Sequence, residues 1–152
     1  MAKMNPKNLM ISTFLGALII GVLLASGCIQ TENNTAQLET QIQIIENITL
    51  EEAYISIQEN KNNPNFVILD VRTPEEFLSE YIENAVNLDY YSDTFRNDLD
   101  KLDKNKTYLI YCRSGRRSGN ALNIMKELDF REVYNMLGGI VKWKSKGLPT
   151  TK

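Results

Sequence analysis

One short stretch of the chain gathers residue types that could do chemistry through a cysteine thiolate. Cys112 follows an apolar run at 107–111, and the residues after it are Arg113, Ser114, Gly115, Arg116, Arg117 and Ser118. The thiolate is the nucleophilic form of cysteine, and nearby cations and free backbone N–H groups stabilise it. This composition predicts a reactive thiolate, with a pKa for Cys112 below the free value of about 8.5.

The residues on either side of Cys112 predict the elements that position it. The β-prone run at 107–111 is typical of a strand. Apolar residues then recur at helical spacing from Ser118 to Leu128, and Ser118 is a favourable N-cap. Between them, a tight loop would hold Cys112 at the floor of a nest of N–H groups, where a helix N-terminus favours negative charge. The same nest would bind an anionic substrate. The alternative is a buried, inert cysteine, which does not account for the neighbouring arginines.

Composition excludes several classes of site. The chain has 17 basic and 19 acidic residues, which gives no indication of nucleic-acid binding. It contains no histidine, so Cys-His and Ser-His catalytic pairs and histidine metal sites are ruled out. The two cysteines, Cys28 and Cys112, are too few for a zinc site or a disulfide framework. We therefore expect neither a metal nor another cofactor.

Residues 1–28 have the layout of a secretory signal. Lys3 and Lys7 precede an apolar run at 9–25, and small residues stand directly before Cys28. Residues 24–28 resemble the lipobox of secreted lipoproteins, in which the cysteine is acylated, although Ala25 occupies the usual leucine position. An uncleaved membrane helix is the alternative, at the short end of what spans a bilayer. Both interpretations tether the chain to a membrane with Cys112 outside the cytoplasm.

The next segment, 29–43, is polar and has no apolar period, so it predicts a flexible linker ahead of a folded domain at 44–152. Glycosylation sequons occur at Asn33, Asn47 and Asn105.

Strand and helix patterns alternate along the folded domain. The Phe66–Leu69 run is continuously apolar, as in strands buried on both faces of a parallel sheet. Capping boxes at Thr49 and Thr73 mark two helix starts. Strands are predicted at 42–45, 66–69, 85–88, 107–111 and 133–136, and helices at 49–58, 73–80, 93–102, 118–128 and 140–146. This order predicts an α/β fold of three layers, with a parallel sheet of about five strands and helices on both faces. Cys112 would lie at the carboxyl end of a strand, where such folds bind ligands.

From about Glu46 to Pro149 the chain resembles a single-domain rhodanese, a member of the sulfurtransferase family. Four stretches carry the resemblance: Val67–Arg72 with Glu75–Phe77, Tyr81–Leu88, Tyr111–Ser118, and Leu137–Ile140 with Trp143 and Gly147–Pro149. The second stretch departs from the family pattern, with Glu80-Tyr81 in place of Gly-His and Asn84 in place of a glycine. The resemblance implies that these changes affect only the shape of the rim of the substrate pocket.

The resemblance implies a sulfurtransferase. Cys112 would take sulfur from an anionic donor, thiosulfate or polysulfide, and pass it from a persulfide to cyanide, a thiol or a partner protein. Backbone N–H groups of 113–118 would stabilise the persulfide. The loop arginines would orient the donor, with Arg117 pointing inward; a solvated surface charge is the alternative for Arg116.

Three other residues have structural interpretations. Asp70 and Arg72 are expected to form an ion pair that braces the loop, and Trp143 is expected to anchor the last helix.

Three alternative functions remain at this point. A phosphatase or arsenate reductase would carry Cys-x5-Arg, but Ser118 occupies the arginine position. A non-catalytic rhodanese-like module, for binding or for carrying sulfur, is the second alternative, and binding modules commonly lack the cysteine. A disulfide oxidoreductase would need a resolving thiol, and Cys28 belongs to the predicted anchor.

Overall fold

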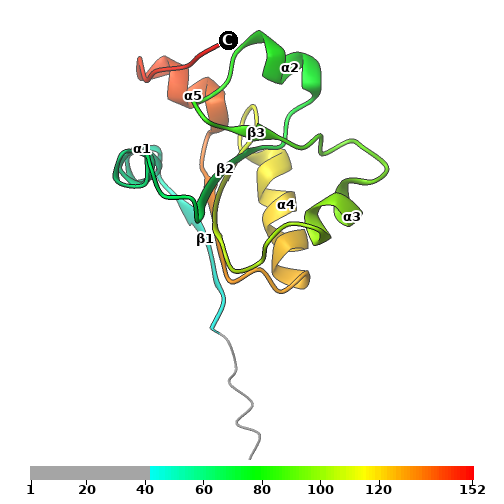
Figure 1. The fold of residues 1–152 in the computed structure, drawn as a ribbon. Helices are drawn as coiled ribbons and strands as arrows, with labels where there is room; N and C mark the ends of the chain where they lie inside the picture. Colours follow the sequence, from blue (N-terminus) through cyan, green and yellow to red (C-terminus); the bar gives the residue numbers. More distant parts are fainter. Residues whose placement is uncertain (1–41) are drawn as a thin grey trace, which may run out of the picture. The chain divides into compact units, whose positions relative to one another are not determined.

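The computed structural model describes residues 42–152, which form a five-stranded sheet with helices packed against it (Figure 1). The predicted signal or anchor with Cys28, the sequon at Asn33 and most of the predicted linker lie outside these described residues. Within 42–152, no helix has both the length and the hydrophobicity needed to cross a bilayer.

Strands and helices alternate through the described chain. Their bounds are β1 (Ile44–Ile48), α1 (Leu50–Glu59), β2 (Phe66–Asp70), α2 (Pro74–Ser79), β3 (Val86–Asn87), α3 (Phe95–Asp100), β4 (Thr107–Tyr111), α4 (Arg116–Glu127), β5 (Glu132–Met136) and α5 (Gly139–Ser145). Neighbouring strands are all parallel, in the order β1-β5-β4-β2-β3. The predicted α/β fold with a five-stranded parallel sheet is confirmed. The first strand begins at Ile44 instead of Ile42.

Both predicted capping boxes are present. The Thr49 hydroxyl accepts a hydrogen bond from the Glu52 N–H, and the Glu52 carboxylate accepts one from the Thr49 N–H. Thr73 and Glu76 repeat this arrangement at the start of α2. The reciprocal bonds satisfy N–H groups that have no partner within the helix.

Helix α4 begins at Arg116, so the predicted N-cap at Ser118 is wrong. Its N-cap is Gly115, in the left-handed conformation with a φ of 97°. Ser118 lies in the first turn, and its hydroxyl donates to the Gly115 carbonyl and toward the Cys112 sulfur. The local rule failed because a capping serine needs an extended backbone, and the chain has already turned at Gly115.

Each face of the sheet has its own apolar core. On one face, α3 and α4 cover side chains that include Leu69, Ile110 and Val133. On the other face, α1 and α5 cover Ile68 and Leu109. Figure 1 shows α1 on one side of the strands and α3 and α4 on the other. Successive strand residues point to opposite faces, so Ile68 and Leu69 bury β2 on both sides, as its apolar run predicted.

The Trp143 side chain anchors α5, as predicted. It is buried in the α1–α5 core, its ring centroid is 5.9 Å from that of Tyr54, and its Nε1–H donates to the Pro149 carbonyl at 2.9 Å. This bond satisfies the polar atom of the buried indole.

The end of β4 lies at a switch point of the sheet. After β2 the chain continues to β3 at one edge, and after β4 it continues to β5 on the opposite side. The carboxyl ends of β2 and β4 are adjacent, because Asp70 pairs with Tyr111. Open α/β sheets bind ligands outside such a point. Cys112 directly follows β4 and therefore lies where a ligand site is expected.

The start of α5 packs tightly against the chain that follows β4. The Ile140 N–H donates to the Cys112 carbonyl at 2.9 Å, and the Val141 N–H donates to the Arg113 carbonyl at 3.1 Å. A Cβ on Gly139 would collide with the Cys112 carbonyl oxygen and lie 2.7 Å from the Arg113 carbonyl oxygen. Gly139 also has a φ of 57°. Both space and backbone conformation therefore require glycine here.

We expect Gly139→Ala to lower the free energy of unfolding by about 3 kcal/mol or more, because left-handed strain and backbone overlap add. Gly147→Ala is the matched control: its φ is 70°, but nothing lies within 4 Å of the added Cβ. That variant should lose only about 1 to 2 kcal/mol from strain. Urea denaturation measures both losses, and equal losses would contradict the steric argument.

Candidate active site

The segment between β4 and α4 surrounds the Cys112 sulfur with hydrogen-bond donors. The carbonyls of Cys112 and Arg113 are engaged by α5, which leaves the N–H groups of the loop to face the sulfur. The Gly115 N–H donates to Sγ at 3.2 Å. Gly115 also packs closely on the turn before α5, since a Cβ there would lie 3.2 Å from the Gly138 nitrogen.

The site lowers the pKa of Cys112 from its ordinary value. Burial by itself raises the pKa of this thiol, but hydrogen bonds from the Ser118 hydroxyl and from the N–H groups of Ser118, Ser114 and Gly115 outweigh burial and lower it. The Ser118 hydroxyl is 3.5 Å from Sγ. The pKa of Cys112 is lowered in the predicted direction, chiefly by neutral donors on the loop, and the Arg117 charge acts in the same direction.

The sulfur lies on the inner side of the loop. Cys112 is 1% exposed, and it packs with the α3–α4 core. Arg113, Ser114 and Arg116 are exposed on the outer side of the same loop. The sequence predicted that the cysteine would lie at the floor of a nest of N–H groups. In the structure the surrounding residues bury it almost completely.

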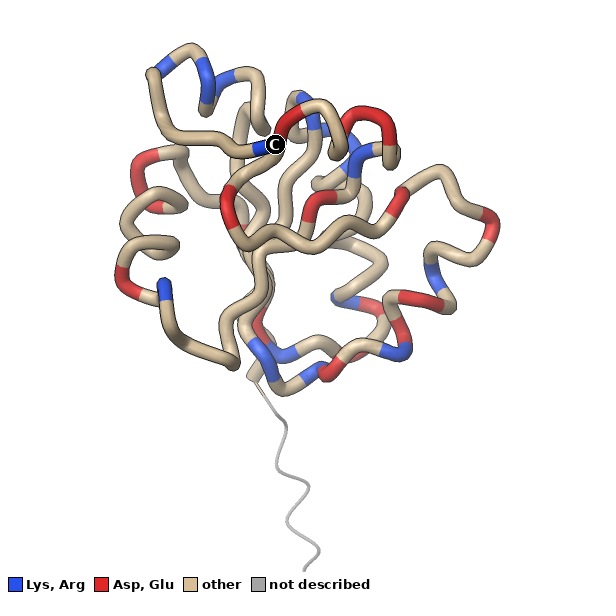
Figure 2. The backbone as a smooth tube through the Cα atoms, turned by 45° about the horizontal axis from the view of Figure 1, so that its top comes forward, with Lys and Arg blue, Asp and Glu red and all other residues tan. Residues whose placement is uncertain are grey.

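A pocket of about 380 Å³ lies against the outer side of this loop. Its lining comes from two connections at the carboxyl edge of the sheet and from the starts of α2 and α4: Thr73, Glu76, Tyr91, Arg113, Ser114, Arg116 and Arg117. Figure 2 shows acidic and basic residues close together at this end of the domain. Arg116 is exposed, and it also lines the pocket, so it combines both interpretations drawn from the sequence.

The Arg117 side chain points inward, as predicted, and Glu76 holds it. Its two terminal nitrogens donate to the two Glu76 carboxylate oxygens at 2.6 and 2.8 Å. The guanidinium carbon is 5.4 Å from the centre of the Tyr91 ring. The bonds to Arg117 lower the pKa of Glu76. They also raise the pKa of Arg117, and the nearby Cys112 charge acts in the same direction.

Asp70 and Arg72 form the predicted ion pair, with Nη2 and Oδ2 2.5 Å apart and both side chains buried. The same Arg72 nitrogen donates to the Glu80 carbonyl at 2.7 Å, and the guanidinium lies 5.7 Å from the Tyr111 ring centre. The pair therefore braces the segment after α2, and it touches the residue before Cys112.

Sequence reasoning missed two side chains that shape the pocket, Glu76 and Tyr91. Glu76 was identified only as a capping residue, and it does hold the Thr73 N–H at 3.3 Å. No local signal links it to Arg117, which follows 41 residues later. Tyr91 lies in an irregular connection and carried no motif. Among residues 42–152, no group of three or more His, Cys, Asp or Glu side chains could hold a metal ion.

Comparison with known proteins identifies the family. The Rhodanese-like domain family matches residues 55–146, so the chain belongs to the rhodanese-like domain family. The resemblance seen in the four sequence stretches is thereby confirmed.

Relatives with similar sequences include named sulfurtransferases. Thiosulfate sulfurtransferase GlpE of Coxiella burnetii is 35% identical over 81 residues, covering 53% of this chain and 74% of that protein. Thiosulfate sulfurtransferase PspE of Escherichia coli is 34% identical over 84 residues, covering 55% of this chain and 77% of that protein. An uncharacterized protein of Synechocystis is 34% identical over 97 residues, which is 64% of this chain, and the match spans 53% of that protein's length.

Solved structures share the fold. A rhodanese-related protein from Thermoplasma volcanium has a TM-score of 0.56 at 28% identity, covering 72% of this chain and 97% of that chain. A protein from Lactobacillus plantarum has a TM-score of 0.57 at 25% identity, covering 69% and 87% of the two chains.

The departures in the second signature have local structural explanations. Asn84, in place of a glycine, has a φ of 65°, a left-handed conformation that asparagine tolerates better than most residues. Tyr81 stacks on Phe77, with ring centroids 4.3 Å apart, and its backbone pairs with Thr151. Tyr81 thus contributes to the packing of the fold, and exposed Asn84 supplies a left-handed backbone position.

We expect Ser118→Ala to raise the pKa of Cys112, because the hydroxyl that stabilises the thiolate is removed while burial is kept. The thiolate fraction would then form at higher pH, so the rate of alkylation by iodoacetamide should reach its half-maximum at higher pH. Ser114→Ala is the matched control, since Ser114 contributes its backbone N–H and its side chain is exposed. Identical pH profiles for the two variants would contradict the role of the hydroxyl.

Proposed function

We propose that this protein is a sulfurtransferase that moves sulfane sulfur from an anionic donor to a nucleophilic acceptor through a Cys112 persulfide. The observation that carries the proposal is a hydrogen-bonded cysteine with a lowered pKa, within the residues that match the rhodanese-like domain family. The thiosulfate sulfurtransferase names of two relatives support the same reaction class.

In the first step, the Cys112 thiolate attacks the outer sulfur of thiosulfate or polysulfide. A sulfur–sulfur bond forms to Cys112, the bond between the outer and inner sulfurs of the donor breaks, and its electron pair leaves with sulfite or a shortened polysulfide. The outer sulfur of the new persulfide carries the negative charge. Loop N–H groups such as that of Gly115 would stabilise this anion, as they stabilise the thiolate.

In the second step, an acceptor attacks the outer persulfide sulfur and regenerates the Cys112 thiolate. Cyanide would leave as thiocyanate, and a thiol or a protein thiol would leave as a persulfide. The donor product departs before the acceptor reacts, so ping-pong kinetics are expected.

The burial of the Cys112 sulfur restricts access to it in both steps. Because 1% of Cys112 is exposed, an incoming atom reaches Sγ only when neighbouring side chains move aside. A terminal sulfur projects beyond the body of its donor and needs the smallest opening.

After incubation with thiosulfate and removal of excess donor, we expect intact-mass spectrometry to show the gain of one sulfur atom. Cys112→Ser should abolish this gain and the formation of thiocyanate from cyanide. Cys28→Ser is the matched control, and it should keep both. A wild-type chain that gains no sulfur from any sulfane donor would leave the non-catalytic binding module as the better explanation.

We further propose that the N-terminal segment attaches the chain to a membrane, with the rhodanese-like domain outside the cytoplasm. The basic residues Lys3 and Lys7, the apolar run at 9–25 and the small residues before Cys28 support this proposal.

Labelling of expressing cells with a fatty-acid analogue tests the form of the anchor. We expect label on the wild-type chain and none on the Cys28→Ser variant, because the acyl groups would be carried by that cysteine. An unlabelled wild-type chain that still fractionates with membranes would indicate the uncleaved helix instead.

A further inference from the structure

The charges around the pocket beside Cys112 do not match those of a dianion. Three arginines, Arg113, Arg116 and Arg117, and one glutamate, Glu76, are among the residues that line this pocket, and together they give the lining a net charge of +2. The Cys112 thiolate on the inner side of the loop reduces this to +1. A donor with one negative charge would bring the site to neutrality, whereas thiosulfate would leave an excess negative charge.

Glu76 is held in place from two directions, so its charge is a fixed part of the pocket. Its carboxylate accepts the Thr73 N–H of the capping box at 3.3 Å and binds both terminal nitrogens of Arg117. The Arg117 side chain is 10% exposed and the Glu76 side chain is 29% exposed. The carboxylate therefore remains accessible to a ligand while it occupies the hydrogen-bonding edge of the guanidinium.

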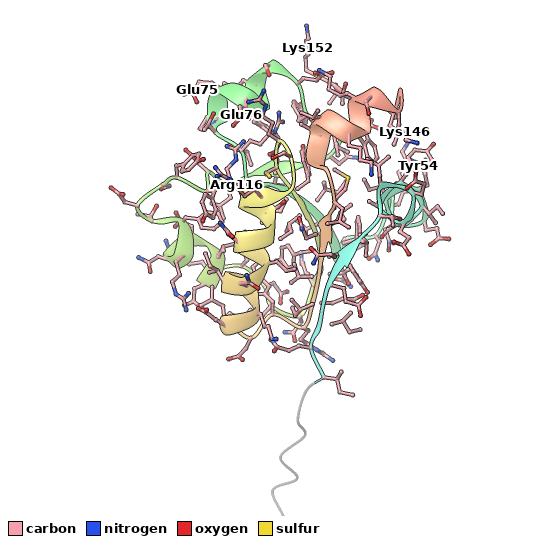
Figure 3. All side chains as sticks on the ribbon, turned by 180° about the vertical axis from the view of Figure 1, so that it is seen from behind. Tyr54, Glu75, Glu76, Arg116, Lys146 and Lys152 are labelled. Carbon is pink, nitrogen blue, oxygen red and sulfur yellow. The ribbon has the colours of Figure 1, made fainter. Side chains whose placement is uncertain are left out.

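Two adjacent glutamates on α2 differ in whether they line the pocket. Glu75 and Glu76 lie side by side in sequence on α2, and Figure 3 shows them above Arg116 at the start of α4. Only Glu76 of the two lines the pocket. Glu75 is exposed, which makes it a control for the general effect of a carboxylate at this end of the domain.

We propose that Glu76 makes the site selective for sulfane donors that carry a single negative charge, such as persulfide or thiosulfonate anions, over dianionic thiosulfate. The inference rests on the proposed sulfur transfer through Cys112. The physical reason is that excess charge is costly in a partly buried site, where water screens it poorly. Loss of the carboxylate would also leave the Arg117 guanidinium free to bind an oxyanion with two hydrogen bonds.

Methanethiosulfonate and thiosulfate are a matched pair of donors, because a methyl group replaces one charged oxygen. In each case the thiolate attacks the outer sulfur, a bond to Cys112 forms, and the donor sulfur–sulfur bond breaks. The electron pair leaves with methanesulfinate or with sulfite. The ratio of kcat/KM for the two donors, compared between variants, cancels their different intrinsic reactivities.

The test compares this ratio in the purified full chain and in Glu76→Gln. Glutamine at this position keeps a capping-box acceptor, so α2 should still form. We expect kcat/KM for thiosulfate to rise by about tenfold, an effect typical of one charge in a focusing cleft, and that for methanethiosulfonate to rise by about threefold, because the same change in potential acts on one charge instead of two.

Two controls isolate the charge. Glu75→Gln should leave the donor ratio at its wild-type value. The double variant Glu76→Gln/Arg117→Gln restores the original net charge, so it should lose the gain toward thiosulfate. A double variant that keeps the gain would overturn the charge argument.

The outcomes separate this inference from the proposed function. Sulfur transfer from both donors with the same ratio in the wild type and Glu76→Gln would overturn selection by Glu76 and leave the sulfurtransferase intact. Transfer from neither donor in the wild type would overturn the proposed function, and this inference with it.

Discussion

Two backbone hydrogen bonds join the start of α5 to the chain that follows β4, from Ile140 to the Cys112 carbonyl and from Val141 to the Arg113 carbonyl. These bonds pair both peptide oxygen atoms with N–H donors of α5. The N–H groups that remain on the inner side, including that of Gly115, are then free to donate to Sγ. Close approach of the two segments depends on Gly139, where a side chain would meet the loop backbone.

The site balances burial against hydrogen bonding. An enclosed sulfur favours the neutral thiol, and burial is the largest single influence on the pKa of Cys112. Several donors on one loop together reverse that preference, each through a short-range contact that water does not screen. The side chains of Arg113 and Arg116 are exposed on the loop, where they act on an approaching ligand, whereas Arg117 points inward and is held by Glu76. One loop thus carries both the donors that stabilise the thiolate and the arginines that meet the ligand.

Ion pairs organise the carboxyl edge of the sheet. Asp70 and Arg72 connect the end of β2 to the Glu80 carbonyl, and Glu76 connects α2 to Arg117 on α4. Each pair is bidentate or shares its donors with a backbone carbonyl, a geometry that fixes direction as well as distance. The apolar cores of the two sheet faces end at this edge. Charged groups therefore hold the connections that surround the pocket.

The sequence by itself determined what depends on neighbours along the chain. The apolar runs of β2 and β4, the capping boxes and the cysteine loop are local patterns, and each led to the right element or motif. Only the tertiary structure decided the hydrogen bonds from α5 to the loop carbonyls and the pairing of Glu76 with Arg117. These features join segments far apart in sequence. Their free energy comes from contacts that exist only after the sheet has assembled, so no local pattern encodes them.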